Sequence, residues 1–154
     1  MPELIITNPR QVVINGLQSA VGYTYALTAF THNIHWNITG RGFFQLHAAL
    51  GENYEALFET IDLLAERIRA LDGFVSVNLA KFWNDAALPE LNAPFDCCDA
   101  IDKLIGAHEK NVATLKGLSE TCAKLNDLET QNMILDVITA EQKRIWMLKS
   151  YRKD

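Results

Sequence analysis

The sequence predicts an all-α protein, a bundle of four long helices with a short extra helix in the connection between the second and the third. Apolar residues recur at helical spacing over four long segments. No stretch alternates apolar and polar residues as a half-buried strand does, and no repeat of solenoid period occurs. The 154 residues, 49% hydrophobic and 21% charged, predict one globular domain spanning residues 1–154.

The first long helix is predicted from about residue 9 to residue 36. Asn8 is a typical N-cap, and Pro9 follows at the first helical position, where its missing N–H is tolerated. Apolar residues then follow one helical stripe at Val13, Leu17, Ala20, Leu27 and Ile34. The segment NITGRG, residues 37–42, ends the helix with turn-forming asparagine and glycine.

The second long helix is predicted from about residue 43 to residue 71. Its apolar positions are Leu46, Leu50, Tyr54, Leu57, Phe58, Ile61, Leu64, Ala65 and Ile68. Asp72-Gly73 provides the stop signal. Arg67 and Arg69 stand in the last turns, where the negative end of the helix dipole favours cations.

The next segment, residues 74–95, lacks a long helical pattern. We expect a short helix over Ser76 to Trp83, followed by the loop PELNAP, which has a proline at each end. This segment therefore forms the connection between the two halves of the bundle.

The third long helix is predicted from about residue 96 to residue 124, with Asp96 or Asp99 near its start. The fourth is predicted from about residue 127 to residue 150. Its apolar positions are Ile134, Leu135, Ile138, Ile145, Trp146 and Leu148.

Charge and composition narrow the function. A net charge of -5 argues against a large nucleic-acid surface on the body of the protein and suits attraction of cations. We see no signal peptide and no apolar run that could span a membrane, so we expect a cytoplasmic protein. Cys97, Cys98 and Cys122 are odd in number and suit mostly buried thiols in a reducing compartment.

Histidines and carboxylates are the side chains left for chemistry, because phosphate-binding loops and a nucleophile elbow are absent from the sequence. His32 and His35 lie near the end of the first helix, and His47 lies just inside the second. A lone histidine in an apolar helix is ordinarily a core residue, but three this close together weaken that explanation. His108 stands alone in the third helix, and we interpret it as a structural or surface residue.

Asp62 and Glu66 are one helical turn apart and share a face of the second helix. Their neighbours in the sequence are largely apolar, so we expect at least one carboxylate to point toward an apolar seam. A solvated pair on the helix surface is the alternative for both residues.

The distance along the helix divides these candidates into two groups. His47 and Asp62 are 15 residues apart, which is roughly 22 Å in a helix, so they cannot share a metal within one chain. The turn brings His35 beside His47, at the opposite end of the hairpin from Asp62. If all of them form one site, it requires an antiparallel two-fold dimer with two identical sites. Such ligands suit a divalent first-row metal such as iron.

Three segments carry a resemblance to a known family. The sequence resembles the Dps family (DNA-binding proteins from starved cells), the miniferritins, in three segments. These are HWNITGRGFFQLH, LFETIDLLAERIRALDG and, in the last helix, KRIWML. The resemblance extends over the whole chain and implies a ferritin-like bundle assembled as a homo-dodecamer of two-fold dimers. It also implies a ferroxidase that oxidises Fe(II) with hydrogen peroxide or O2, stores ferric mineral and protects against oxidative stress.

Carried over position by position, the resemblance implies that His35, His47, Asp62 and Glu66 bind the iron. The family builds its sites between two subunits, in agreement with the distance argument. Trp36 matches the tryptophan beside the site, where it can intercept electrons, although packing explains it equally well.

The sequence departs from the family pattern at two positions near the site. Gly51 stands where an acidic residue commonly helps a second, weaker iron position, and the adjacent Glu52 is rotated by about 100° on the helix. His32 stands where many members have lysine, and it is a further candidate ligand.

Iron enters family members through acidic pores near the start of the last helix. The matching residues are Asp127 and Glu129, with Asn132 where aspartate is common and Asp136 as its substitute one turn on. Acids on a solvated helix face are the ordinary alternative.

DNA binding is the weakest implied property. The N-terminal MPELIITNPR has one basic residue, whereas the C-terminal KSYRKD is short but basic. A nucleoid-compacting protein with weak or vestigial ferroxidase activity is therefore the alternative function, and a purely structural bundle is a third.

Overall fold

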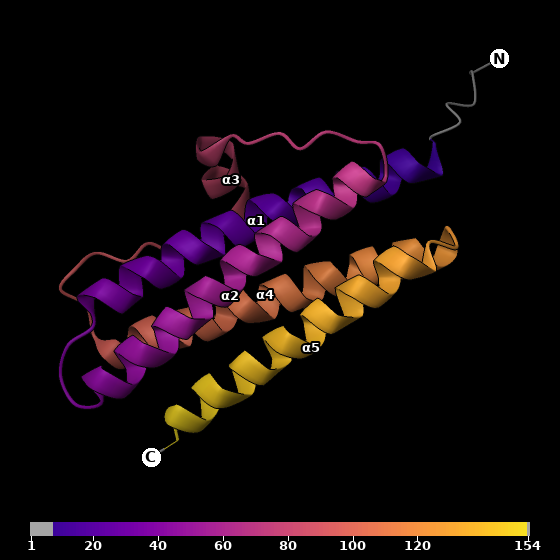
Figure 1. Cartoon of the computed structure of the whole chain (residues 1–154). Coiled ribbons are helices and arrows are strands. Elements are labelled where there is room, and N and C mark those ends of the chain that lie inside the picture. Colours follow the sequence, from indigo (N-terminus) through magenta and orange to yellow (C-terminus); the bar gives the residue numbers. More distant parts are fainter. Residues whose placement is uncertain (1–7, 154) are drawn as a thin grey trace.

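The computed structural model describes residues 8–153, which form five helices and, within that range, no strand. The helices are α1 (Pro9–Asn37), α2 (Phe43–Ala70), α3 (Leu79–Ala86), α4 (Cys97–Lys124) and α5 (Leu128–Tyr151). Figure 1 shows the four long helices side by side, with the short α3 beside α1. The predicted all-α bundle with an extra helix between its second and third long helices is confirmed.

Side-chain caps fix where the helices begin. The side chains of Asn8, Asp96 and Asp127 accept hydrogen bonds from backbone N–H groups in the first turns of α1, α4 and α5. Each long helix begins and ends within a residue of its predicted bounds, including α2, which has no side-chain cap at Gly42. The short helix was predicted over 76–83 and lies three residues later, because Asn78 caps it by accepting from the Lys81 N–H.

The helix α2 ends, as expected, with a residue in the left-handed conformation. That residue is Asp72 and not Gly73. Asp72 has φ 65°, and the Gly73 N–H donates to the Ile68 carbonyl at 3.0 Å. The turn after α4 is built in the same way on Asn126, at φ 58°. An aspartate or asparagine can adopt this conformation, so glycine is not required there.

Most of the predicted apolar positions are buried in two adjoining clusters that run along the bundle. The predictions are wrong for Phe58, Leu135 and Trp146, which are exposed. Each follows a buried or half-buried apolar residue directly, so it is rotated by about 100° away from the core stripe. Among the helices of residues 8–153, none is both long enough and apolar enough to cross a bilayer.

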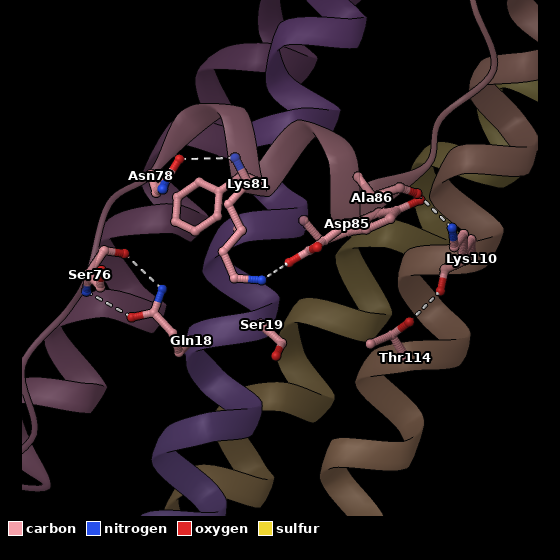
Figure 2. Close-up of a pocket in the computed structure, with 12 residues that line it drawn as sticks. Gln18, Ser19, Ser76, Asn78, Lys81, Asp85, Ala86, Lys110 and Thr114 are labelled. Atoms are coloured by element: carbon pink, nitrogen blue, oxygen red, sulfur yellow. Dashed lines mark hydrogen bonds and ion pairs between the residues drawn. The ribbon is translucent and has the colours of Figure 1, made fainter.

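The helix α3 is held against α1 beside a cleft of about 390 Å³ that is also lined by α4 (Figure 2). The Gln18 amide donates to the Ser76 carbonyl at 2.8 Å and accepts from the Ser76 N–H at 2.9 Å. The Lys110 ammonium donates to the Ala86 carbonyl at the other end of α3. The cleft lining contains no histidine and none of the residues predicted for a metal site.

Gly22 allows Phe82 of α3 to approach α1. A Cβ at Gly22 would lie 2.6 Å from Phe82 Cδ1, and a packed ring cannot move aside easily. We expect Gly22→Ala to lower the free energy of unfolding by about 1–3 kcal/mol. Gly106→Ala is the control, because a Cβ there meets nothing within 4 Å. Urea unfolding at fixed protein concentration measures both, and equal stability of the two variants would contradict this packing.

A buried polar network joins α2, α4 and α5 in the middle of the bundle. The His108 and Glu141 side chains are 0% and 1% exposed, and Nδ1 of His108 lies 2.6 Å from Glu141 Oε2. Asn111 and Arg144 also donate to the Glu141 carboxylate, and Asn53 Nδ2 lies 3.1 Å from His108 Nε2. Of the two interpretations of His108, the structure shows the structural one.

Candidate metal centre

The imidazole ring of His35 contacts the backbone carbonyl of His47, and the ring of His47 contacts the backbone carbonyl of His35. Nδ1 of His35 lies 2.8 Å from the His47 carbonyl, and Nδ1 of His47 lies 3.0 Å from the His35 carbonyl. The two rings stack with their centroids 3.8 Å apart. A carbonyl oxygen only accepts, so Nδ1 carries the proton in both rings. In a neutral ring of this tautomer, Nε2 carries the lone pair with which histidine binds metals.

The turn between α1 and α2 makes this pairing possible. Gly40 and Gly42 have φ 95° and 81°, conformations that glycine adopts without strain. The chain therefore reverses tightly enough to place the end of α1 beside the start of α2. The predicted proximity of His35 and His47 is confirmed.

Burial also favours the neutral form of His35, which is 8% exposed. Burial lowers the pKa of His35 below its ordinary value, and the neighbouring His47 and His32 lower it further, against the opposing hydrogen bond to His47. Because the folded-state pKa is lowered, the imidazole stays neutral to a lower pH than a free histidine.

Asp62 and Glu66 are both exposed on α2, so the prediction that one points into an apolar seam is wrong. The buried stripe of α2 runs through Ile61, Leu64 and Ile68, and the acids lie off it. Within residues 8–153 neither carboxylate has a hydrogen bond or ion pair. Both carboxylates are therefore free to act on a group outside the chain.

The predicted ligands thus fall into two separate sets. Among the described residues, no group of three histidine, cysteine, aspartate or glutamate side chains is placed to hold a metal ion. Two imidazoles lie at one end of the α1–α2 hairpin, and two carboxylates lie roughly 22 Å along α2. A single chain therefore places half of the predicted ligands at each end of the hairpin.

A family model described as a ferritin-like domain matches residues 14–154. The chain belongs to the ferritin-like family, as a Dps protein. A "DNA protection during starvation protein" of Helicobacter pylori is 32% identical over 121 residues, which are 78% of this chain and 84% of that protein.

Solved structures of Dps proteins share the fold closely. A Dps protein from Bacillus brevis superposes with a TM-score of 0.89 at 26% identity, covering 97% of this chain and 100% of the other. The Dps protein of Vibrio cholerae gives 0.87 at 27% identity, covering 94% of this chain and 91% of the other. That protein is described as a member of the ferritin-like diiron-carboxylate superfamily.

In this Dps chain His32 lies among aromatic rings. Its ring stacks on Trp36 with centroids 4.7 Å apart, and it lies tilted against the Tyr54 ring with centroids 4.0 Å apart. Trp36 is 67% exposed, and Tyr54 also lies edge-on to the His35 ring at 5.1 Å. We predicted Tyr54 only as a core residue and missed its place beside the histidines. Its spacing of seven residues from His47, two helical turns on one face, could have indicated it.

The acids predicted to line a pore differ in their surroundings. Asp127 accepts from the Thr130 N–H and hydroxyl and pairs with Arg67 at 3.2 Å, so it holds α5 against α2. Glu129 and Asp136 are exposed, as is Asn132. Of the acids predicted for a pore, Glu129 and Asp136 are therefore the two exposed to solvent.

The basic C-terminal segment is largely part of α5, which extends to Tyr151. The Lys149 ammonium donates to Glu109, and the Arg152 guanidinium makes two hydrogen bonds of 2.8 and 2.9 Å to Asp102. Residues 149–152 are therefore not the free tail that the sequence suggested. Residues 1–7 and 154, which complete the two terminal segments, lie outside the described range.

The three cysteines occupy different environments. Cys122 is buried and Cys97 is half-buried, as expected, but Cys98 is exposed. Burial raises the pKa of Cys97, and the neighbouring Cys98 raises it further. A raised pKa keeps the Cys97 thiol protonated, and a protonated thiol is a poor nucleophile.

Proposed function

We propose that this Dps protein is a ferroxidase that oxidises Fe(II), with hydrogen peroxide as the preferred oxidant, and stores the ferric product inside a dodecameric shell. The shell is built from two-fold dimers, acts in the cytoplasm and protects against oxidative stress. The observation that carries the proposal is the reciprocal pairing of His35 and His47, which leaves both Nε2 lone pairs available. The unpaired carboxylates of α2 supply the complementary ligands.

The substrate Fe(II) binds between two chains. His35 and His47 of one subunit donate nitrogen, and Asp62 and Glu66 of the partner subunit donate oxygen. Imidazole and carboxylate suit divalent iron and leave positions open for water and oxidant. The carboxylates also favour the ferric product, because they offset its larger charge.

Iron reaches this site and leaves it along acidic surfaces. We propose that Glu129 and Asp136 line the entry pore, whereas Asp127 serves the packing of α5. Oxidised iron moves to carboxylates that face the cavity, where the mineral nucleates. Two findings support the proposal that this protein handles iron. The chain belongs to the ferritin-like family, and the similar Dps protein of Vibrio cholerae is described as a member of the ferritin-like diiron-carboxylate superfamily.

Removing both imidazoles tests the site. We expect His35→Ala/His47→Ala to lower the initial rate of Fe(II) oxidation at least about 10–100-fold, because even losing an outer partner of a metal ligand costs that much. The protein is loaded with Fe(II) without oxygen, mixed with peroxide and followed by ferric absorbance. The matched control is Gln45→Ala, an exposed residue of α2 that is not among the candidate ligands. Equal initial rates in the double variant and the wild type would refute the assignment.

Gly51 limits each site to one firmly bound iron. A Cβ there would lie 3.5 Å from His35 Cε1, an ordinary contact, so a side chain fits. We expect Gly51→Asp to add a carboxylate beside His35 and to raise the Fe(II) bound per site from one to two. Anaerobic calorimetric titration measures this number, with Gly51→Ala as the control. An unchanged number in Gly51→Asp would show that position 51 does not determine the second iron.

The alternative, a nucleoid-compacting protein with weak or vestigial ferroxidase activity, has less support. Its strongest feature in the sequence was the basic C-terminus, but Lys149 and Arg152 are engaged by Glu109 and Asp102. The body carries a net negative charge, which opposes phosphate binding.

A further inference from the structure

A column of aromatic rings begins at the proposed iron ligand His35. Tyr54 meets the His35 ring edge-on, with centroids 5.1 Å apart. The His32 ring lies tilted against Tyr54, with centroids 4.0 Å apart, and stacks on Trp36, with centroids 4.7 Å apart. Phe58 lies edge-on to both His32 and Tyr54. Within residues 8–153, Tyr54 is thus the phenol or indole side chain in direct ring contact with a proposed ligand.

An oxidisable side chain next to a ligand can supply an electron that the proposed one-iron site lacks. Two imidazoles and two carboxylates suit one iron ion, and Gly51 offers no ligand for a second. One Fe(II) supplies one electron, but the reduction of hydrogen peroxide to water takes two. If the second electron is missing, the other product is a hydroxyl radical.

We propose that Tyr54 supplies this second electron, an inference that rests on the proposed ferroxidase function. In the balanced step, Fe(II), the Tyr54 phenol, hydrogen peroxide and one solvent proton give Fe(III), a Tyr54 phenoxyl radical and two water molecules. The peroxide O–O bond breaks, the iron and the phenol are each oxidised by one electron, and the phenolic proton ends in water. Later Fe(II) ions reduce the phenoxyl radical again.

The structure favours Tyr54 over the other oxidisable rings nearby. Among the described residues, the ring contact of Trp36 is with His32, so two rings, those of His32 and Tyr54, separate Trp36 from His35 along this column. The Tyr54 hydroxyl makes no hydrogen bond to another residue within 8–153, so its proton is not held by the protein. His32 lies between the two rings and keeps Tyr54 in place against His35.

Tyr54→Phe tests the proposal, because it keeps the ring and removes only the hydroxyl. The assembled protein is loaded with one Fe(II) per site, mixed with peroxide, frozen within milliseconds and examined by electron paramagnetic resonance. We expect an organic radical in the wild type whose hyperfine splitting narrows with ring-deuterated tyrosine. The signal should be lost in Tyr54→Phe, and hydroxyl radical captured by a spin trap should rise. Tyr25→Phe is the control, since Tyr25 stacks on Phe82 away from the histidines.

The outcomes separate this proposal from the ferroxidase itself. A radical of equal size in Tyr54→Phe, or one that responds to labelled tryptophan instead of tyrosine, would overturn the role of Tyr54. So would the absence of a radical in a wild type whose oxidation rate still depends on His35 and His47. Equal oxidation in His35→Ala/His47→Ala would overturn the ferroxidase and the role of Tyr54 together.

Discussion

Mixing two inactive variants should restore about a quarter of the wild-type rate of iron oxidation, because each proposed site takes its ligands from two chains. One variant carries His35→Ala and His47→Ala, and the other carries Asp62→Ala and Glu66→Ala. Either variant alone lacks half of the ligands at every site. Refolding the two in equal amounts forms mixed dimers as well as pure ones.

The expected fraction follows from counting sites in these dimers. With random association about half of the dimers are mixed, and each mixed dimer has one site with no altered ligand and one with four. The pure dimers contribute nothing. The control is a mixture of preassembled particles, which should stay inactive. If co-assembled particles, verified by native mass spectrometry, show no recovery, the ligands do not come from two chains.

Glu141→Gln should destabilise the fold more than any other single change in polar residues considered above. It leaves the buried His108 and the partly buried Arg144 without their charged partner. Breaking a buried charge pair on one side costs about 3–5 kcal/mol. For a chain of this length that loss lowers the melting temperature by about 6–20 °C. Calorimetry at fixed protein concentration measures it, because assembly also contributes to stability.

The control is Glu109→Gln, which removes an exposed pair with Lys149 and should cost far less. A melting temperature for Glu141→Gln as high as that of this control would show that the network contributes little. The pH dependence gives a second check. Burial raises the pKa of Glu141, but the hydrogen bonds and charges of His108 and Arg144 outweigh it, so the net pKa is lowered.

A lowered folded-state pKa stabilises the protein above the ordinary carboxyl pKa. That contribution is lost as the pH falls through the lowered value. The stability difference between the wild type and Glu141→Gln should therefore be largest near neutral pH and should narrow on acidification.

The long helices were predictable because their signals are local. Asn8, Asp96 and Asp127 cap the turns that follow them, and the apolar period selects the buried face. The short helix was predicted three residues too early, because its position depends on the Asn78 cap and on the packing of Phe82 over Gly22. That packing joins residues far apart in the chain.

The candidate site was predictable only in part, for a similar reason. Helical rise alone separates His47 from Asp62, and the glycine turn alone joins His35 to His47. For the two carboxylates the pattern left both an apolar seam and a solvated face open, because neighbouring apolar residues do not fix the rotation of α2 to within one residue. The structure shows the solvated face. The contact between Tyr54 and His35 depends on how two helices pack, which the periodicity of one helix does not reveal.

The bonds between His35 and His47 run from each ring to the other residue's main chain. A substitution at one position removes that residue's imidazole but keeps its carbonyl, which is the acceptor for the remaining ring. The hydrogen-bonding partner of each imidazole therefore does not depend on the identity of the other side chain, although the contact between the stacked rings is lost. The hydrogen bond that positions one imidazole survives a substitution of the other residue, which a bond between the two side chains would not.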